Sequence, residues 1–361
     1  MSLRWGIVGL PNAGKSTLFN ALSHAQIPVG NYPFTTIDPH VGVVSVPDPR
    51  LDFLVSKFSP AKVTPALLTF VDIAGLVRGA HEGEGLGNQF LSEIRAVDGI
   101  VMVLRLFQNP DVSHVEGEVD PERDKAVLES ELLLADLGWL EKQLEKTKKI
   151  AKSGDKKNLE QLELETSLYH WIDSGKPARA WRGPQGEISN QVYPELLTAK
   201  KILYALNLDE ETIGRPLAEG VQRWIERERY VVPLCAKLET ELSQLSSEEQ
   251  TLWLRETGME RSRLQDLIVM GYRLVGAITF FTAGPKEVRA WTILEGMTAA
   301  QAGGVIHTDF EKGFVKAEIM AYNDFVKAGS ELEARQRGCI RFEGREYRVR
   351  DGDIIHFRFT S

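Results

Sequence analysis

Five short apolar runs along the chain are rich in strand-forming residues, and most are followed by turn or helix signals. They span residues 3–8, 67–71, 100–104, 202–206 and 230–234. Buried runs of this length, separated by longer polar segments, are typical of parallel strands that alternate with helices. The pattern therefore predicts an α/β fold with a doubly wound, mostly parallel sheet.

A long segment between the third and fourth runs follows a different pattern. Leu133, Leu137 and Leu140 recur at helical spacing, and a similar rhythm resumes after Gly154. Two antiparallel helices joined near this glycine fit the pattern best. Because connections in such sheets are usually short, we interpret residues 125–197 as an α-helical coiled-coil insert.

The pattern changes once more near residue 277. Short alternating segments, punctuated by glycine and aspartate, occupy residues 278–281, 314–319, 347–349 and 354–359. Such segments predict a small α+β domain over residues 277–361. Residues 1–124 and 198–276 then form the α/β domain that the insert interrupts.

Composition narrows the possible partners. The net charge of −8 disfavours bulk attraction to nucleic acid, so no specific DNA partner is expected and any RNA contact needs a local basic patch. No apolar run approaches the roughly 18 residues of a membrane span, and no signal-peptide pattern precedes the first run. We expect a cytoplasmic protein without a membrane partner. Cys235 and Cys339 lie too far apart to indicate a disulfide framework or a zinc site.

A phosphate-binding motif follows the first predicted strand. Gly9, Gly14, Lys15 and Ser16 satisfy the pattern G-x-x-x-x-G-K-[ST] at the start of an amphipathic helix. Backbone N–H groups of such a loop surround phosphates, the lysine reaches the β- and γ-phosphates, and the serine hydroxyl ligates Mg²⁺. The candidate nucleotide-binding residues here are Asn12, Ala13, Gly14, Lys15, Ser16 and Thr17.

A second motif, D-x-x-G, stands at the end of the second predicted strand. Asp72 would meet Mg²⁺ through water, and the N–H of Gly75 would sense the γ-phosphate. The polar segment 31–36 lies between the two motifs, and a threonine there is the expected second side-chain ligand of Mg²⁺. We favour Thr36 over Thr35. The predicted catalytic residues are therefore Lys15, Thr36, Asp72 and Gly75.

These motifs, in this order, closely resemble the Obg-like ATPase family, also called YchF, which belongs to the Obg superfamily of TRAFAC-class P-loop nucleoside triphosphatases. The resemblance extends over nearly the whole chain and is most specific at residues 9–20, 31–44, 71–89, 114–117 and 280–325. It implies a G domain interrupted by a coiled-coil insert and followed by a β-grasp domain of the TGS type. It also implies Thr36 as the magnesium-binding switch threonine.

The base-recognition motif of GTPases is altered in this chain. GTPases of this class read guanine with Asn-Lys-x-Asp, whereas Asn207, Leu208 and Glu210 stand at the corresponding positions after the run 202–206. The longer Glu210 side chain moves the guanine-reading carboxylate by one methylene, so guanine preference should be lost. The residues alone indicate only this loss, and the resemblance implies a preference for ATP.

A second base-contacting segment follows the fifth predicted strand. Cys235 and Ala236 occupy the place of the final base-contacting motif of GTPases, with cysteine instead of the usual serine. A simple turn at the strand end is the alternative interpretation. We therefore include both residues among the candidate nucleotide-binding residues.

The group that positions the attacking water is not evident. Leu76 stands where Ras-like enzymes have a water-orienting glutamine, so intrinsic hydrolysis should be slow. One hypothesis is a K⁺ ion held near Asn12, as the resemblance to potassium-activated relatives suggests. His81 and His114 are further candidates for proton transfer, although a lone histidine is more often structural.

Together these features favour a Mg²⁺-dependent ATPase that acts as a molecular switch. The resemblance implies association with the ribosome, either the large subunit or the 70S particle, and with ribosomal RNA. Candidate RNA contacts are Lys142, Lys146, Lys148, Lys149, Lys152, Lys156 and Lys157 in the hairpin and Arg335, Arg337, Arg341, Arg345 and Arg348 near the C-terminus. Solubilising surface charge is an equally good explanation for any one of them. Two rival functions are a GTPase translation factor and a nucleotide-gated RNA- or ribosome-binding module with negligible hydrolysis.

Overall fold

The computed structural model describes residues 3–24, 40–73, 86–115, 117–183, 186–187 and 193–360. The chain divides into two compact units. We call the first the α/β unit, which comprises Arg4–Gly42 and Thr69–Leu267, and the second the C-terminal unit, which comprises Met1–Leu3, Val43–Leu68 and Ile268–Ser361.

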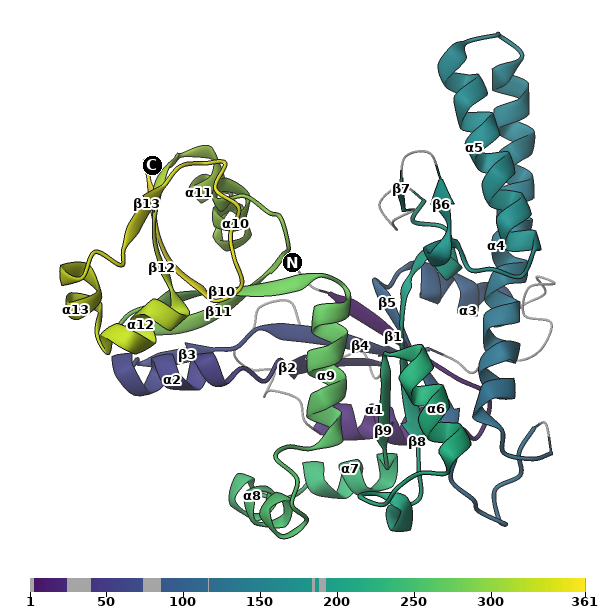
Figure 1. Ribbon diagram of the computed structural model, residues 1–361, viewed down its shortest axis with the longest axis horizontal. Coiled ribbons are helices and arrows are strands. Elements are labelled where there is room, and N and C mark those ends of the chain that lie inside the picture. The colour runs from purple at the N-terminus through teal and green to yellow at the C-terminus, as the bar shows by residue number, and fades with distance from the viewer. Residues whose placement is uncertain are drawn as a thin grey trace. The chain divides into compact units, whose positions relative to one another are not determined.

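A six-stranded sheet with the order β2-β4-β1-β5-β8-β9 forms the centre of the α/β unit (Figure 1). Its strands are β1 Arg4–Val8, β2 Val41–Ser45, β4 Leu67–Asp72, β5 Gly99–Arg105, β8 Lys201–Asn207 and β9 Val231–Leu234. Strand β1 is parallel to both β4 and β5, β5 is parallel to β8, and β8 is parallel to β9. All five strands predicted from the apolar runs are confirmed, and so is the parallel α/β class.

Both faces of the central strands are buried, which explains why their sequences are continuously apolar. Val8, Met102 and Tyr204 share one core cluster with α3, α4 and α6, while Ile7 and Val101 alternate with them and are equally buried. Helix α1 packs against β1 and α7. Outside the insert, the helices of this unit are α1 Lys15–His24, α3 Leu86–Arg95, α6 Glu219–Glu228, α7 Ala236–Ser243 and α8 Ser247–Glu256, and α9 Arg263–Leu274 begins in this unit and ends in the C-terminal unit.

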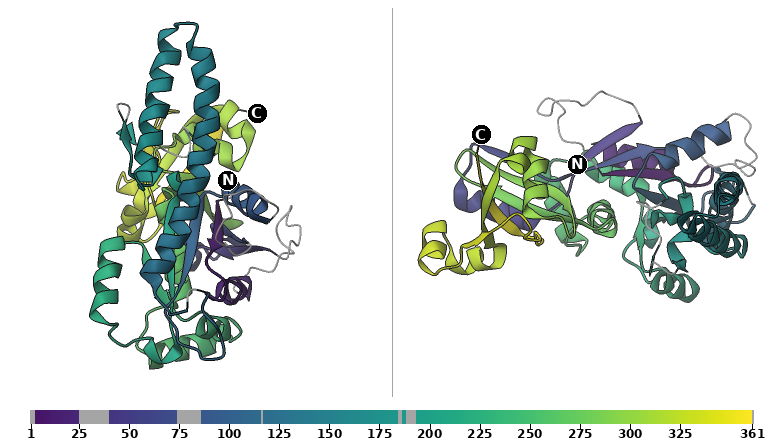
Figure 2. Two further views of the ribbon diagram at one scale, coloured as in Figure 1. Left: turned by 90° about the vertical axis from the view of Figure 1, so that its right-hand side faces the viewer. Right: turned by 90° about the horizontal axis from the view of Figure 1, so that it is seen from above.

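The predicted insert is a helical hairpin of α4 (Pro121–Ala151) and α5 (Lys156–Asp173), which lie side by side (Figure 1, Figure 2). Asp120 caps α4 by accepting hydrogen bonds from the N–H groups of Glu122 and Arg123, and proline occupies the first helical position. Gly154 lies in the turn with a φ of 77°. Although these helices are long, no helix in the described part of the chain is both long and apolar enough to span a membrane. A short hairpin of β6 (Arg182–Gly183) and β7 (Gly186–Glu187) follows.

A buried carboxylate fixes the base of the hairpin to the sheet. Asp136 on α4 accepts hydrogen bonds from the N–H groups of Leu197 and Thr198 at 2.7 and 2.8 Å and from the Thr198 hydroxyl at 2.6 Å. Burial raises the pKa of Asp136 to about 6, against the hydrogen bonds of Thr198. Because Leu197–Ala199 directly precedes β8, this contact sets where the chain re-enters the sheet.

The C-terminal unit contains a mixed sheet with the order β13-β12-β14-β10-β11-β3. Its strands are β3 Lys62–Thr64, β10 Ala277–Ala283, β11 Glu287–Leu294, β12 Phe314–Ala321, β13 Arg341–Glu343 and β14 Asp353–Phe359, and its helices are α2 Pro49–Phe58, α10 Ala299–Ile306, α11 Thr308–Lys312, α12 Tyr322–Ala328 and α13 Glu331–Gln336. Alanines of α10 pack with Phe280 and Phe357 against one sheet face. An α+β domain of this kind was expected.

One alternating segment is not a strand. Residues 347–349 contribute only an isolated bridge between Arg348 and Thr298. The reason is a local turn: the hydroxyl of Tyr347 and the N–H of Arg350 both donate to a carboxylate oxygen of Asp353, at 3.0 and 2.9 Å. These bonds fold the segment back before β14 begins.

Residues 43–68 pack with the C-terminal unit, although the expected boundaries placed them in the α/β domain. Strand β3 pairs in parallel with β11, and the Thr64 hydroxyl donates to the Glu287 carboxylate at 2.6 Å. Arg50 donates to Asp351 at 2.8 Å. The partners are more than 200 residues apart, as the separation of 223 between Thr64 and Glu287 illustrates, and no local pattern in residues 43–68 reveals them.

Candidate nucleotide site

The loop between β1 and α1 has the backbone of a phosphate-binding turn. Asn12 has a φ of 62° and Gly14 a φ of 96°, so two residues of the loop adopt the left-handed region. Any Cβ atom on Gly14 would collide with Nδ2 of Asn207. Glycine is therefore required at this position both by its dihedral angle and by the close approach of a neighbouring side chain.

Two opposite charges lie together beside this loop. The Lys15 ammonium donates to the Leu10 carbonyl at 3.0 Å, and burial lowers its pKa while Asp72 opposes that shift. Burial likewise raises the pKa of Asp72, and Lys15 opposes it. Asp72 ends β4 and its N–H donates to the His40 carbonyl at 2.9 Å. Desolvated charges at the end of parallel strands interact strongly with a polyphosphate or a metal ion placed between them.

Asn207 joins three loops of the site. Its Nδ2 donates to the Ala13 carbonyl at 3.0 Å, and its Oδ1 accepts from the Ala236 N–H at 3.0 Å. Its own carbonyl accepts from the N–H groups of Leu106 and Phe107. The side chain is buried, so these polar groups depend on one another for partners. Asn207 thus fixes the loop after β9 relative to the phosphate-binding loop.

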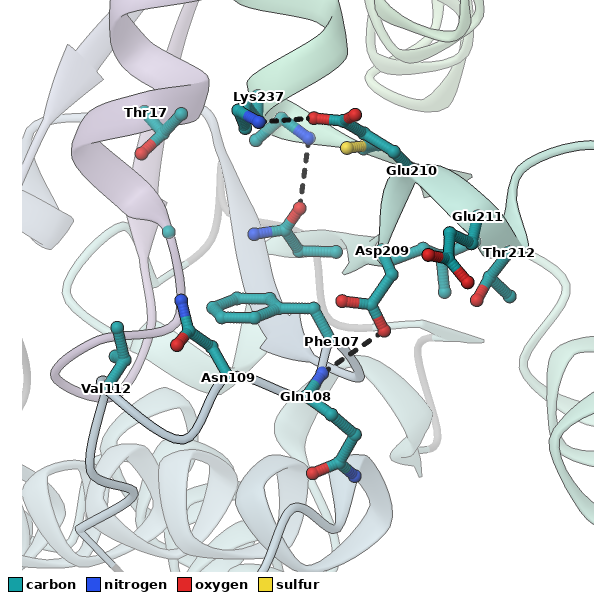
Figure 3. A pocket seen from close by; sticks show the side chains of 15 residues that line it. Thr17, Phe107, Gln108, Asn109, Val112, Asp209, Glu210, Glu211, Thr212 and Lys237 are labelled. Carbon is teal, nitrogen blue, oxygen red and sulfur yellow. Dashed lines mark hydrogen bonds and ion pairs between the residues drawn. The ribbon is translucent and has the colours of Figure 1, made fainter.

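A cavity of about 730 Å³ opens where these loops meet (Figure 3). Its volume lies within the usual range for a small-molecule site. It is lined by Gly14, Thr17, Phe107, Gln108, Asn109, Val112, Asn207, Leu208, Asp209, Glu210, Glu211, Thr212, Cys235, Ala236 and Lys237.

The end of the cavity away from the phosphate loop combines apolar walls with paired charges. Phe107 and the buried Leu208 supply apolar surface. The Glu210 carboxylate lies 2.7 Å from the Lys237 ammonium, as Figure 3 shows. Asp209 accepts from the N–H of Gln108 at 3.2 Å. Two of the three acidic side chains that line this end, Asp209 and Glu210, therefore already have partners in the protein.

Cys235 and Ala236 form the junction between β9 and α7. Cys235 is the N-cap residue of α7, is buried, and has a thiol whose pKa is raised by burial. Its backbone position places the N–H of Ala236 toward Asn207. Since both residues line the cavity, the junction is part of its wall rather than an isolated turn.

The structure brings most of the candidate site residues together. Seven of them line the cavity, namely Gly14, Thr17, Asn207, Leu208, Glu210, Cys235 and Ala236. Asn12, Ala13, Lys15 and Ser16 lie next to them on the loop and on the first turn of α1. Thr36, Gly75, Leu76 and His81 lie outside the described residues.

The segment after β5 also contributes to the cavity and was not among the candidates. Phe107, Gln108, Asn109 and Val112 all line it. Their position directly after a predicted strand could have identified them, because ligands of parallel sheets bind beyond the carboxyl ends of the strands. The apolar run 100–104 ends there, and the segment therefore belongs to the same edge as the P-loop.

His114 forms a buried pair near this segment. Its Nε2 lies 2.9 Å from Oδ2 of Asp124 at the start of α4, and both side chains are 3% exposed. A carboxylate in this position fixes the orientation of the imidazole ring. The pair ties the segment after β5 to the insert.

Within the described ranges, no three His, Cys, Asp or Glu side chains gather as a metal cluster. A Mg²⁺ ion in a P-loop protein takes few protein ligands and several oxygens from phosphates and water. The left-handed turn at Asn12 and Gly14, with Asp72 and Lys15 beside it, fits such an ion bound together with a triphosphate.

Two family models match the chain. One, described as a 50S ribosome-binding GTPase, matches residues 4–163. The other, named for the C-terminal part of YchF GTPases and described as a protein of unknown function (DUF933), matches residues 277–360.

Several full-length relatives are similar to the chain. The ribosome-binding ATPase YchF of Bacillus subtilis is 46% identical, with 100% of both chains covered. Obg-like ATPase 1 of Homo sapiens is 45% identical, with 100% of this chain and 93% of the relative covered. Among solved structures, the YchF GTPase of Schizosaccharomyces pombe matches with a TM-score of 0.87 at 38% identity, covering 99% of this chain and 97% of that one.

Proposed function

The chain belongs to the YchF family of Obg-like ATPases, and from that premise we propose that it is an ATP-hydrolysing switch that associates with the ribosome. The observation that carries the proposal is the cavity beside the P-loop, whose base end holds Leu208 and Glu210 instead of a guanine-reading lysine and aspartate. The P-loop family supplies the expectation of Mg²⁺ dependence.

The phosphate end of the site is assigned to the P-loop. Backbone N–H groups of Ala13 and Gly14 surround the phosphates, Lys15 moves from the Leu10 carbonyl to the β- and γ-phosphates, and Thr17 follows at the helix start. Bound Mg²⁺ neutralises charge that develops on the phosphates. Ser16 and Thr36 would hold the ion by their hydroxyls, and Asp72 would hold it through water.

The base end is assigned to adenine. Guanine needs a carboxylate that accepts from its ring N–H and exocyclic amine. The carboxylate at the motif position, that of Glu210, lies 2.7 Å from the Lys237 ammonium, and burying guanine donors without partners costs affinity. Leu208 and Phe107 offer an apolar slot that accepts an adenine ring without such donors.

The hydrolytic step is assigned to the switch backbone. Gly75 would contact the γ-phosphate through its N–H, and Leu76 would give the attacking water no side-chain partner at the usual position, so basal turnover should be slow. We add a K⁺ ion near Asn12 as an element of this proposal. The Asn12 Nδ2 atom donates to the Ser113 carbonyl at 3.1 Å. This bond fixes the amide so that its oxygen, rather than its nitrogen, can bind a cation.

The ribosome is the proposed partner because the bacterial relatives are named ribosome-binding ATPases. The hairpin of α4 and α5 concentrates lysines toward its tip, where a phosphate backbone can reach them. We propose that this tip and the C-terminal arginines contact ribosomal RNA, on the large subunit or the 70S particle. A cytoplasmic location follows from this partner. As part of the proposal we keep the division into an α/β domain (residues 1–124 with 198–276), an insert (125–197) and a C-terminal domain (277–361), with the difference that residues 43–68 pack with the C-terminal unit.

Competition of ATP and GTP against a fluorescent nucleotide tests the base assignment. The wild type should prefer ATP, and Leu208→Lys combined with Glu210→Asp should shift the preference toward GTP by about tenfold or more. The matched control is Leu252→Lys with Glu256→Asp on α8, which makes the same two changes away from the cavity. GTP preference in the wild type would refute the ATPase assignment and support the GTPase translation factor.

A second measurement separates a hydrolysing switch from a nucleotide-gated binding module. The switch predicts that ATP turnover rises when ribosomes are added and that nucleotide exchange resets binding. A module without hydrolysis predicts full ribosome binding with a slowly hydrolysed ATP analogue and no rise in turnover at any ribosome concentration.

A further inference from the structure

Arg105, the last residue of β5, is a buried cation with an unusual set of partners. Its exposed fraction is 2%. Within the described part of the chain, no carboxylate forms an ion pair with it. A buried guanidinium without a counter-charge is costly in free energy unless its N–H groups find other hydrogen-bond acceptors.

Backbone carbonyls of the following loop surround this guanidinium. Nε donates to the carbonyl of Phe107 at 3.2 Å, and Nη2 donates to that of Val112 at 2.9 Å. Longer contacts reach the carbonyls of Asn109 at 3.5 Å and Ser113 at 3.4 Å. Only arginine offers five donors in one rigid plane, so one side chain organises a loop that spans seven residues, 107–113.

The same side chain supports an aromatic wall of the cavity. The guanidinium carbon of Arg105 lies 4.3 Å from the centre of the Phe107 ring, within the range of a cation–π interaction. Phe107, Gln108, Asn109 and Val112 all line the cavity, and Figure 3 shows Phe107 extending between the P-loop side and Asp209. The Phe107 ring, which lines the cavity, is therefore supported by Arg105, which does not line it.

We propose that Arg105 is a positioning residue for nucleotide binding, which holds residues 107–113 in place as the wall against the base. The inference rests on the proposed nucleotide site. It assigns the buried charge a role in base affinity rather than in the stability of the fold.

The two ends of this loop are held differently, which makes the effect selective. The Ser113 carbonyl also accepts from Nδ2 of Asn12 at 3.1 Å, and His114 is paired with Asp124. The far end therefore keeps anchors when Arg105 is removed. The near end keeps the bonds from the N–H groups of Phe107 and Gln108 to Asn207 and Asp209. Its carbonyls at Phe107 and Asn109 lose their guanidinium donors, and the Phe107 ring loses the cation–π contact. Base contacts should weaken while phosphate contacts persist.

The test compares ATP with inorganic tripolyphosphate, each bound with Mg²⁺, on the full-length chain. In Arg105→Met, an apolar side chain of similar length replaces the buried charge without leaving an unpaired cation. If the wall is then in place about a tenth of the time, the apparent Kd for ATP rises about tenfold. The Kd for tripolyphosphate should stay within about twofold of the wild type. Arg105→Lys should not restore ATP affinity, because one ammonium cannot reach carbonyls spread around a plane.

A matched control exists at the residue immediately before β8. Lys200 is also a buried cation, and its ammonium donates to the carbonyls of Arg95 and Val97 at 3.2 and 2.6 Å. It does not line the cavity. Lys200→Met should change the melting temperature without changing the ratio of the two Kd values.

A second variant covers the case in which Arg105→Met does not fold. Pro110→Gly loosens the same loop from its exposed side and keeps the buried charge. It should raise the Kd for ATP by a smaller factor in the same direction, again without affecting tripolyphosphate. Equal loss of both ligands in Arg105→Met, or an unchanged Kd for ATP in either loop variant, would overturn the inference. A wild type that binds neither ATP nor GTP would instead refute the proposed function.

Discussion

The side chain of Asn207 donates a hydrogen bond of 3.0 Å to the carbonyl of Ala13 in the phosphate-binding loop. This residue occupies the first position of the altered base-recognition motif, so base recognition and phosphate binding share one buried amide. Its oxygen also fixes the N–H of Ala236 at the start of α7. One side chain thereby sets the distance between three loops that must act on the same ligand.

Asn207→Ala should weaken ATP binding by at least about tenfold and lower the free energy of unfolding by about 2 kcal/mol or more. The physical reason is that the buried carbonyl of Ala13 and N–H of Ala236 both lose their partner. Nucleotide titration and thermal unfolding measure the two effects. Asn323→Ala, at an exposed position of α12, is the control and should leave both quantities unchanged. Normal affinity in Asn207→Ala would show that the loops hold their arrangement without this amide.

Asp136 should make stability depend on pH in the acidic range. Its folded pKa of about 6 lies above the ordinary value of about 3.9, so the folded state binds more protons between these values. Stability from this group is therefore greatest below about pH 4 and falls as the pH rises to about 6, by up to about 3 kcal/mol. Melting temperatures of the wild type and Asp136→Asn across this range measure it, with the exposed Asp173→Asn as control. Parallel curves for wild type and Asp136→Asn would contradict the assignment.

Potassium should stimulate ATP turnover. If an ion near Asn12 takes part in charge stabilisation, replacing KCl by NaCl at constant ionic strength should lower turnover by about tenfold or more. Asn12→Ala should remove this dependence and leave a low rate in either salt. Equal rates of the wild type in both salts would eliminate the ion from the mechanism.

Charges at the hairpin tip should support ribosome binding. Changing Lys152, Lys156 and Lys157 to glutamine should weaken co-sedimentation with ribosomes and reduce the slope of log affinity against log salt by up to about 3. The same change at Lys286, Lys312 and Lys327, which are exposed in the C-terminal unit, controls for total charge. ATP turnover without ribosomes should not change in either variant. Equal weakening in both variants would mean that the tip has no specific role.

Local sequence patterns were sufficient for the parallel sheet and the hairpin. The runs that became β5 and β8 are apolar at every position because both of their faces are covered, and leucines at helical spacing mark α4. The P-loop was equally readable, since Gly14 and Lys15 are required by chemistry at fixed spacing.

Long-range pairing was not readable from the same patterns. Nothing in residues 62–64 indicates that they complete a sheet with β11, and Tyr347 alternates like a strand residue while its hydroxyl supports a turn through Asp353. In the site, Phe107 was missed because its role depends on Arg105 and on the loop that both residues share. Such roles follow from tertiary contacts, which a motif does not encode.

The pairing of β3 with β11 has a consequence for gene truncation. Phe53 and Phe58 of α2 pack against Phe325, with ring centres 6.3 and 5.5 Å apart, and β3 hydrogen-bonds with β11. A stop codon placed before residue 277 would delete these partners and expose apolar rings and an open strand edge. The part of the C-terminal unit after residue 277 therefore cannot be deleted without affecting the rest of the chain. The truncated chain should aggregate and should not behave as an isolated ATPase domain. A loss-of-function phenotype caused by such a truncation would then reflect low solubility, and not the loss of a partner-binding surface.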